Sequence, residues 1–551
     1  MIQSPNLPKP HSELHRTRYA RRIRAGIALL CQADATRQAG SCGAPGGRGR
    51  ASARSALPTL AVGVLQRRAG ALSGRRSATL NEALAGLETV IRTLPRYLAL
   101  AALCLAATVR AGSGPVHEYS LDNGMRVIVK EDHRAPVVVS QVWYRIGSSY
   151  EHAGITGVSH VLEHMMFKGT DKHGPGEFSR IIAENGGREN AFTSRDYTAY
   201  FQQLEQSRLP VALELEADRM RNLLLPEEEF NKEVRVVMEE RRLRTEDKPE
   251  ALTFEQFNAT AFLNSPYRNP VIGWMTDLES MNIQDLERWY RRWYAPNNAI
   301  LVVAGDVDPD AVAKLAAQHF GPHQAEEVAP PKPRTEVEQK GLRRIRVQAP
   351  AEVPYLLLGY KVPVLLTAEN DWEPYALEVL AGILDGGQSA RLPRILVRDR
   401  QLVAEAGAGY DLYGRQQTLF LLDATPAEGV DIEEVEKALR GQIQRLRSEP
   451  VSAAELDRVK AQVVAGRVYE EDSIFYQAMK IGRLESIGLD WRVGEQYVER
   501  IQAITAEQLQ AVARKYLVEE RLTVARLDPL PMDAEARARA RAAGMAGSPR
   551  H

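Results

Sequence analysis

From about residue 116 onward, some segments repeat hydrophobic residues at every second position and others at every third or fourth position. This predicts a mixture of strands and helices. The pair Asn123-Gly124 is typical of a tight turn between two strands, and Val137–Tyr144 is a β-branched apolar run typical of another strand. Helical spacing then predicts helices over residues 155–167, 176–185, 209–223, 226–245 and 283–293, followed by a strand over residues 299–304.

A charged, proline-rich stretch between residues 321 and 339 interrupts this pattern. Pro330, Pro331 and Pro333 give it the composition of a linker. Afterwards the pattern predicts a strand over 354–360, a helix over 372–384, strands around 418–424, helices up to residue 516 and a strand over 521–525. The chain is therefore expected to fold as two halves.

The two halves share a faint repeat at an offset of 222 positions. The identical pairs are Arg292/Arg514, Tyr294/Tyr516, Val302/Val524 and Asp306/Asp528. We predict an α+β fold with two similar domains from an internal duplication, each a mixed, mostly antiparallel sheet with helices packed on it. The predicted ranges are 116–321 for the first domain, 322–345 for a hinge linker, 346–530 for the second domain and 531–551 for a tail.

The first hundred residues have a different composition. Residues 1–93 are rich in Arg, Gly, Ala and Ser, which predicts a disordered extension or an upstream translation artefact. Residues 94–111 combine Arg96, a short apolar run and small residues near Ala111, which is the pattern of a signal peptide. No Met occurs between Met1 and Met125, so we predict a non-Met start near Leu94 and a periplasmic or secreted product.

Overall charge and cysteine content give no sign of a nucleic-acid partner, an anionic membrane partner or thiol chemistry. Lys+Arg and Asp+Glu are both 71 in the 551 residues, so charge gives no reason to expect nucleic acid or an anionic membrane as partner. Cys31, Cys42 and Cys104 all precede the predicted cleavage point, and the mature chain is expected to be free of thiols and of a transmembrane span.

The segment from His160 to His164 carries the candidate chemistry. His160, Glu163 and His164 are three and four residues apart in a predicted helix, and therefore project from one face. Two imidazoles one turn apart can share a zinc ion, and the carboxylate beside them is placed to take a proton from the attacking water. The helix over 226–245 offers Glu233 and Glu240 on one face; one could bind metal while the other supports a ligand.

These segments resemble the pitrilysin/insulinase family of zinc peptidases, whose inverted motif is H-x-x-E-H. The resemblance covers most of residues 116–529 and is strongest to the mitochondrial-processing-peptidase-like branch and its bacterial periplasmic relatives. It rests on LDNG at 121–124, HVLEHMMFKGT at 160–170, and NAFT at 190–193 with Asp196 and Tyr197. It implies one zinc per chain held by His160, His164 and Glu240, with Glu163 as general base and Glu233 as supporting acid.

The resemblance also implies two domains that form a clam-like chamber around a hinge. Substrates in the family bind as extended strands beside a sheet edge, and Asn190, Ala191, Phe192 and Thr193 match that edge segment. The same four residues also suit an ordinary strand after the Gly186-Gly187 turn.

The second half departs from the family pattern. No His occurs between His323 and His551, so the second half has no counterpart of the zinc ligands. Single-chain members carry an Arg and a Tyr, seven apart, that hold the substrate carbonyl, but Val397 and Ala404 occupy those places here. A small shift of the alignment would instead offer Arg398 or Arg400 with Tyr410 or Tyr413.

We therefore predict a zinc metalloendopeptidase that acts on extended or unfolded peptides. It would be the zinc-bearing subunit of a heterodimer, and a related chain would supply the Arg and the Tyr. The alternative is a non-catalytic structural or peptide-binding subunit of a larger complex.

Overall fold

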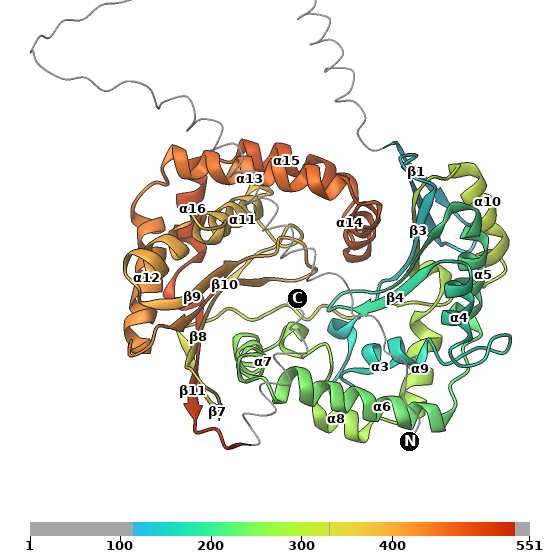
Figure 1. The fold of residues 1–551 in the computed structure, drawn as a ribbon, viewed down its shortest axis with the longest axis horizontal. Helices are drawn as coiled ribbons and strands as arrows, with labels where there is room; N and C mark the ends of the chain where they lie inside the picture. The colour runs from blue at the N-terminus through green and yellow to red at the C-terminus, as the bar shows by residue number, and fades with distance from the viewer. Residues whose placement is uncertain (1–113, 330, 535–551) are drawn as a thin grey trace, which may run out of the picture. The chain divides into compact units, whose positions relative to one another are not determined.

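The computed structural model describes residues 114–329 and 331–534, shown in colour in Figure 1. The predicted extension and signal peptide, and residues 535–551 of the predicted tail, lie outside the described residues. No helix in the described ranges is long and apolar enough to cross a bilayer.

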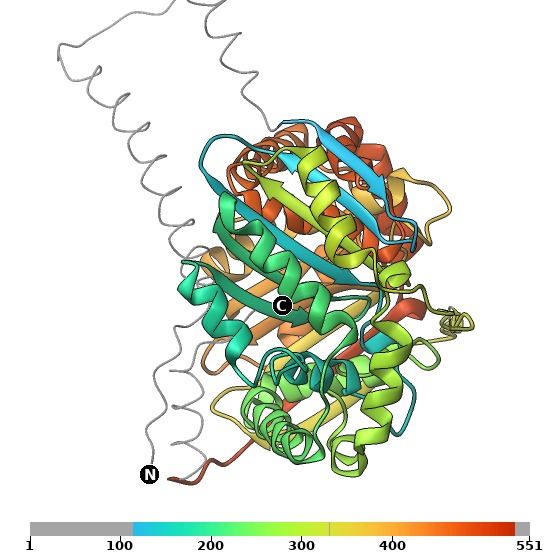
Figure 2. The same cartoon turned by 90° about the vertical axis from the view of Figure 1, so that its right-hand side faces the viewer.

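The first half forms a six-stranded sheet, which faces the viewer with its helices in Figure 2. Its strand order is β1-β2-β6-β3-β5-β4, and every pairing is antiparallel except β2 with β6. The strands are β1 (Val116–Ser120), β2 (Arg126–Glu131), β3 (Val137–Tyr144), β4 (Arg188–Thr193), β5 (Thr198–Glu205) and β6 (Ala299–Gly305). The helices are α3 (Val158–Met165), α4 (Glu177–Glu184), α5 (Leu209–Arg221), α6 (Glu227–Arg241), α7 (Pro249–Ala261), α8 (Met275–Ser280), α9 (Ile283–Trp293) and α10 (Pro309–Phe320).

The second half repeats this topology in a five-stranded sheet of order β7-β11-β8-β10-β9, in which only β7 and β11 are parallel. Its strands are β7 (Arg343–Pro350), β8 (Tyr355–Val362), β9 (Val403–Gly409), β10 (Thr418–Pro426) and β11 (Leu522–Leu530). Its helices are α11 (Trp372–Asp385), α12 (Ile432–Ser448), α13 (Ala453–Glu471), α14 (Ile474–Ile487), α15 (Arg492–Ala503) and α16 (Ala506–Tyr516). Strands β2 to β6 therefore correspond in order to β7 to β11, and the predicted α+β fold with two similar sheets is confirmed.

Several elements differ from the sequence prediction. The helix predicted over 155–167 is shorter, because Gly157 has a φ of 90° and the regular helix begins only at Val158. Helices α7, α8 and α10 and strands β5, β7 and β9 were not predicted, and β7 begins at Arg343, inside the range predicted as linker.

Each half contributes one helix to the sheet of the other half. Helix α7 packs on β7, β8 and β11, where Phe257 and Phe262 form a buried cluster with Leu357 and Leu419. Helix α14 packs on β3 and β6, beside the first sheet in Figure 1. At that contact a Cβ on Gly482 would lie 2.1 Å from the Trp143 indole nitrogen, so only glycine fits.

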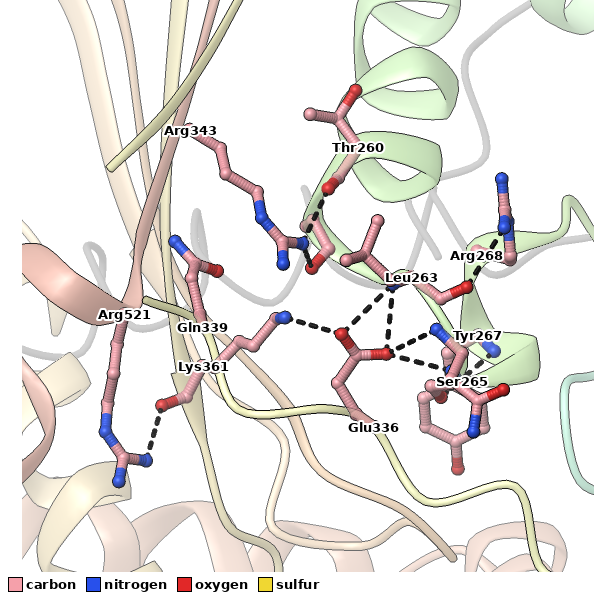
Figure 3. Close-up of polar contacts among 12 residues, drawn as sticks. Thr260, Leu263, Ser265, Tyr267, Arg268, Glu336, Gln339, Arg343, Lys361 and Arg521 are labelled. Atoms are coloured by element: carbon pink, nitrogen blue, oxygen red, sulfur yellow. Dashed lines mark hydrogen bonds and ion pairs between the residues drawn. The ribbon is translucent and has the colours of Figure 1, made fainter. Parts of the chain in front are cut away.

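The linker itself is bonded to both halves. The Glu336 carboxylate accepts hydrogen bonds from the backbone N–H groups of residues 263–265 and from Lys361 Nζ on β8, at 2.7 to 3.0 Å (Figure 3). The Lys361 and Glu336 side chains are only 4% and 1% exposed. The predicted hinge segment is thus anchored by a buried ion pair; whether it acts as a hinge stays a prediction.

Candidate metal centre

Helix α3 begins at a point that two carboxylates fix. Glu151 accepts hydrogen bonds from the backbone N–H groups of Gly157 at 2.7 Å and Ser159 at 2.9 Å. Asp277 accepts from the backbone and hydroxyl of Thr156, at 3.1 and 2.6 Å. Both acids satisfy donors at or just before the first turn, where helices leave N–H groups unpaired. The helix that carries His160 is therefore held at its amino end.

Helices α3 and α6 bring His160, His164 and Glu240 together. One donor atom from each residue lies within 4.8 Å of the others. Glu240 Oε2 is 3.9 Å from His160 Nε2 and 3.5 Å from His164 Nε2, and the two imidazole rings are 4.9 Å apart between centroids. All three side chains are at most 22% exposed. The predicted spacing thus gives a compact set of two imidazole nitrogens and one carboxylate.

Glu233 supports this set from the preceding part of α6. Its Oε2 is 3.1 Å from His164 Nδ1, and its Oε1 is 2.6 Å from Lys168 Nζ. Burial would raise the pKa of Glu233, but the bonds from His164 and Lys168 outweigh burial and lower it. Glu233 is therefore an anion that orients the His164 ring from the side opposite Glu240.

The imidazole pair is arranged for one bound cation. Burial, together with the neighbouring His164, lowers the pKa of His160 to about 4. Burial acts in the same direction on His164, yet Glu233 and Glu240 outweigh it and raise its pKa to about 9. Glu240 itself has a lowered pKa, because His164, His160 and Arg244 together outweigh its burial. The carboxylates thus favour positive charge between the rings.

These residues fit a zinc ion. Zinc takes nitrogen and oxygen ligands, and a histidine that binds it normally donates its other ring N–H to a carboxylate or carbonyl. His164 has that arrangement through Glu233. The Nδ1 of His160 is buried without a hydrogen-bond partner among the described residues, which leaves its Nε2 facing Glu240 as the nitrogen to bind a metal.

Glu163 lies beside this set on α3 and has a different partner. Thr193 Oγ1 on β4 donates to its Oε2 at 2.5 Å. Burial raises the pKa of Glu163, and the bond from Thr193 only partly opposes that shift. A carboxylate with a raised pKa near a metal-ligand set has the properties of a general base.

The predicted substrate segment forms an exposed edge. Strand β4, which contains Asn190, Ala191, Phe192 and Thr193, is the last strand of its sheet and pairs with β5 alone among the described strands. The Phe192 ring packs edge-on against Trp143 at 5.4 Å, which fixes the strand to the core. The other edge of β4 is thus available to a further strand.

The candidate clamp residues of the second half lie on separate elements, with Arg400 Nη2 at 3.7 Å from Glu434 Oε1, and a clamp formed by them stays a prediction. Val397 lies in the short helix Leu392–Asp399 and Ala404 on β9. The Tyr410 hydroxyl donates to the Pro363 carbonyl at 2.6 Å, and Tyr413 is partly buried beside Arg483. Gln401, which lies between Val397 and Ala404, adopts a φ of 52°, a strained backbone conformation for a non-glycine residue.

Sequence reasoning missed three residues around the site and one contact of a residue that it had named. They are Glu151 and Asp277 at the start of α3, Lys168 beside Glu233, and Thr193 as the donor to Glu163. Lys168 follows His164 by four residues, a spacing that could have suggested its place on the same face. Glu151 precedes the backbone groups that it binds by six and eight residues, a spacing without a regular motif. Asp277 and Thr193 make contacts across 121 and 30 positions, for which the sequence offers no local signal.

Comparison with known proteins places the chain in a family. Residues 126–274 match the insulinase (peptidase family M16) model, and residues 280–463 match the peptidase M16 inactive domain. The zinc protease PqqE of Helicobacter pylori is 34% identical over 362 residues, which is 65% of this chain and 80% of PqqE. An uncharacterized zinc protease of Bacillus subtilis, YmxG, is 25% identical over 74% of this chain and 96% of its own length.

Solved structures agree with the fold. The crystal structure of a protease from Helicobacter pylori has a TM-score of 0.72 at 30% identity, over 76% of this chain and all of that one. The periplasmic protease PqqL of Escherichia coli has a TM-score of 0.64 at 18% identity, over 78% of this chain and 50% of that one, and this likeness shows the fold alone. The family predicted from the H-x-x-E-H segment is confirmed, and this chain belongs to the insulinase (M16) family of peptidases.

Proposed function

We propose that this chain is a zinc-dependent endopeptidase that hydrolyses extended or unfolded peptides. The observation that carries the proposal is the convergence of His160, His164 and Glu240 beside Glu163. The relatives named as zinc proteases support the metal and the class of reaction. One zinc per chain is the stoichiometry that a single set of three ligands supports.

The residues around the centre have separate roles. His160, His164 and Glu240 would hold the zinc, and Glu233 would keep the His164 ring in place. Zinc at such a site polarises a carbonyl and lowers the pKa of water towards about 7. Glu163 accepts the proton of the attacking water and passes it to the leaving amine. The hydroxyl of Thr193 fixes the Glu163 carboxylate relative to the edge strand.

An extended peptide is the substrate shape that suits the exposed edge of β4. A peptide that adds a strand there pairs through its backbone, so that binding depends little on its side chains. The contact between Thr193 and Glu163 couples this edge directly to the general base. Most strands of a folded protein are already paired on both edges, which favours unfolded or short peptides as substrates.

Activity is proposed to require a related second chain. Neither Val397 nor Ala404 can donate a hydrogen bond from its side chain, the Tyr410 hydroxyl already donates to the Pro363 carbonyl, and Tyr413 is partly buried beside Arg483. A substrate carbonyl would lack the donors that position it, and positioning can supply several kcal/mol of barrier reduction. A partner bearing an Arg and a Tyr would restore these donors. We further propose a periplasmic or secreted location, on the signal-peptide pattern of residues 94–111.

The test is metal analysis followed by hydrolysis of a quenched, extended peptide. We expect about one zinc per chain, slow cleavage by the chain alone, and faster cleavage when the partner is titrated in. Glu163→Gln should retain zinc while losing at least ~10²-fold in rate, because an amide cannot accept the proton. Full metal with no hydrolysis under any condition, with or without the partner, would favour the alternative of a non-catalytic peptide-binding or structural subunit.

A further inference from the structure

A cavity of about 380 Å³ lies where the two halves of the chain meet, apart from the metal-ligand set. The first half contributes Arg126, Arg145 and Tyr150 to its wall. The second half contributes Arg415 and residues 485–490, from the end of α14 and the turn that follows. Its charged lining consists of three arginines and two acids, Glu485 and Asp490, so that the wall carries a net charge of +1.

The carboxylates in this wall are already engaged. Glu485 is paired with Arg126 and also accepts from the backbone N–H of Trp491. Asp490 pairs with Arg492 at 2.9 Å. Neither acid lies within ion-pair distance of Arg145 or Arg415, although Arg126 is also paired with Glu118 and Glu485 attracts Arg145 over a longer distance.

Arg145 has no carboxylate within ion-pair distance among the residues that the structure describes, and its Nε is buried without a hydrogen-bond partner. Burial lowers the pKa of Arg145, and the positive charge of Arg126 adds to this effect. A guanidinium remains charged in proteins. An unpaired, partly buried guanidinium is unfavourable, and a bound anion would stabilise it.

Arg415 is only loosely paired. Its Nη1 is 3.5 Å from Ser149 Oγ and 3.9 Å from Asp196 Oδ1, while its guanidinium lies 4.0 Å above the Tyr150 ring. Asp196 is committed elsewhere, because it accepts from Ser149 Oγ at 2.8 Å and from the Tyr267 hydroxyl. Two guanidiniums with unused donors thus line the same cavity.

The cavity is attached to the end of the edge strand. The backbone N–H groups of Ser148 and Ser149, next to Tyr150, donate to the carbonyls of Ser194 and Arg195 at 3.1 and 2.7 Å. Ser194 and Arg195 directly follow Thr193, the last residue of β4. A chain that lies along β4 and continues past Thr193 would therefore be led towards this wall.

We propose that the Arg145/Arg415 cavity binds a carboxylate group of the peptide substrate, either its C-terminus or an acidic side chain. The planar guanidinium fork suits a carboxylate, and the net charge of the wall suits a single negative charge. The size of the cavity suits one residue or a chain end rather than a whole peptide. This inference rests on the proposed function, since it assigns a specificity subsite to that peptidase.

Binding, rather than hydrolysis, tests the subsite. The probes are fluorescein-labelled ten-residue Ala/Ser/Gln peptides, each made as a free acid and as an amide, with a single Glu moved through the positions. They are titrated by anisotropy into the zinc-loaded Glu163→Gln chain at low salt, because salt screens exposed charges beyond about 10 Å. We expect one carboxylate source to strengthen binding about tenfold, which is the scale of a charged hydrogen bond. A preference for the free acid identifies the C-terminus, and a preference for one Glu position identifies a side chain.

Two variants and one control decide the outcome. Arg145→Met and Arg415→Met should each reduce the preference, and Arg145→Lys should keep part of it. Arg288→Met removes a surface arginine that is 71% exposed and should leave the preference unchanged. Equal binding of all peptides by the parent chain, or a preference that persists in both Met variants, would overturn the subsite. A preference that depends on Arg145 in a chain that never hydrolyses peptides would retain the subsite and reject only the proposed reaction.

Discussion

Two glutamates on α6 offer a matched test of ligand and support. Glu233 and Glu240 are seven residues apart on one face, and each replacement by Gln removes a charge with almost no change in shape. Glu240 Oε2 faces both imidazole Nε2 atoms, at 3.9 and 3.5 Å. Glu233 instead contacts the far nitrogen of His164 at 3.1 Å. The structure therefore predicts unequal losses of zinc.

The magnitudes follow from these contacts. In Glu233→Gln the amide oxygen can still accept one bond, from His164 or from Lys168, and zinc affinity should fall about 10–100-fold, the usual cost of losing such support. This corresponds to about 1.4–2.8 kcal/mol. Glu240→Gln removes the only anionic ligand of a three-ligand set, and we expect affinity to fall by more than about 100-fold.

The assay is a competition titration of the metal-free chain against a fluorescent zinc chelator. Glu239→Gln is the control, because Glu239 is 60% exposed and pairs only with Arg242 at 3.1 Å. We expect zinc affinity to be highest in the parent and Glu239→Gln chains, lower in Glu233→Gln and lowest in Glu240→Gln. A Glu233→Gln chain that loses its zinc while Glu240→Gln keeps it would show that the two roles are exchanged.

Three further perturbations test other parts of the chain. His164→Ala should bind much less than one zinc per chain by metal analysis, because only His160 and Glu240 remain; stoichiometric zinc would contradict its role as a ligand. Thr193→Val removes the hydrogen bond that stabilises ionised Glu163, so the acid limb of the pH profile of kcat/KM should move up by about one pH unit. An unchanged pH profile would show that this hydrogen bond does not affect the pKa of the general base. Burial raises the pKa of Glu378 from 4.5 to about 7, so its stabilising contribution is complete below its unfolded pKa and is lost as pH rises through the folded value. Relative to Glu378→Gln, the parent chain should therefore lose about 3 kcal/mol in urea unfolding between about pH 5 and about pH 8; parallel pH profiles of the two chains would refute the shift.

Local patterns were sufficient to predict several elements of the first half. The Asn123-Gly124 turn, the strand Val137–Tyr144 and the helix Ile283–Trp293 occur as predicted, because each has a strong local signal. The H-x-x-E-H spacing placed two imidazoles on one face without any tertiary information. The family match agrees with that spacing.

Elements stabilised by distant partners were missed. Helix α7 buries Thr253, Glu255 and Asn258, so its sequence lacks the apolar stripe of an ordinary surface helix. Strand β7 begins Arg343-Arg344-Ile345-Arg346, and this run of arginines hides a strand that is defined by pairing with β11. The Thr193 contact to Glu163 joins residues 30 positions apart, so periodicity could not indicate it.

The reciprocal placement of α7 and α14 has a consequence for the ancestry of the chain. If the ancestor was a single half, neither copy could cover its own sheet, and two copies would have exchanged these helices as a domain-swapped dimer. Fusion of the two copies would then have needed only a connecting segment. A modern chain cut in the linker should accordingly behave as an obligate pair of fragments, which remain associated with each other and do not fold separately.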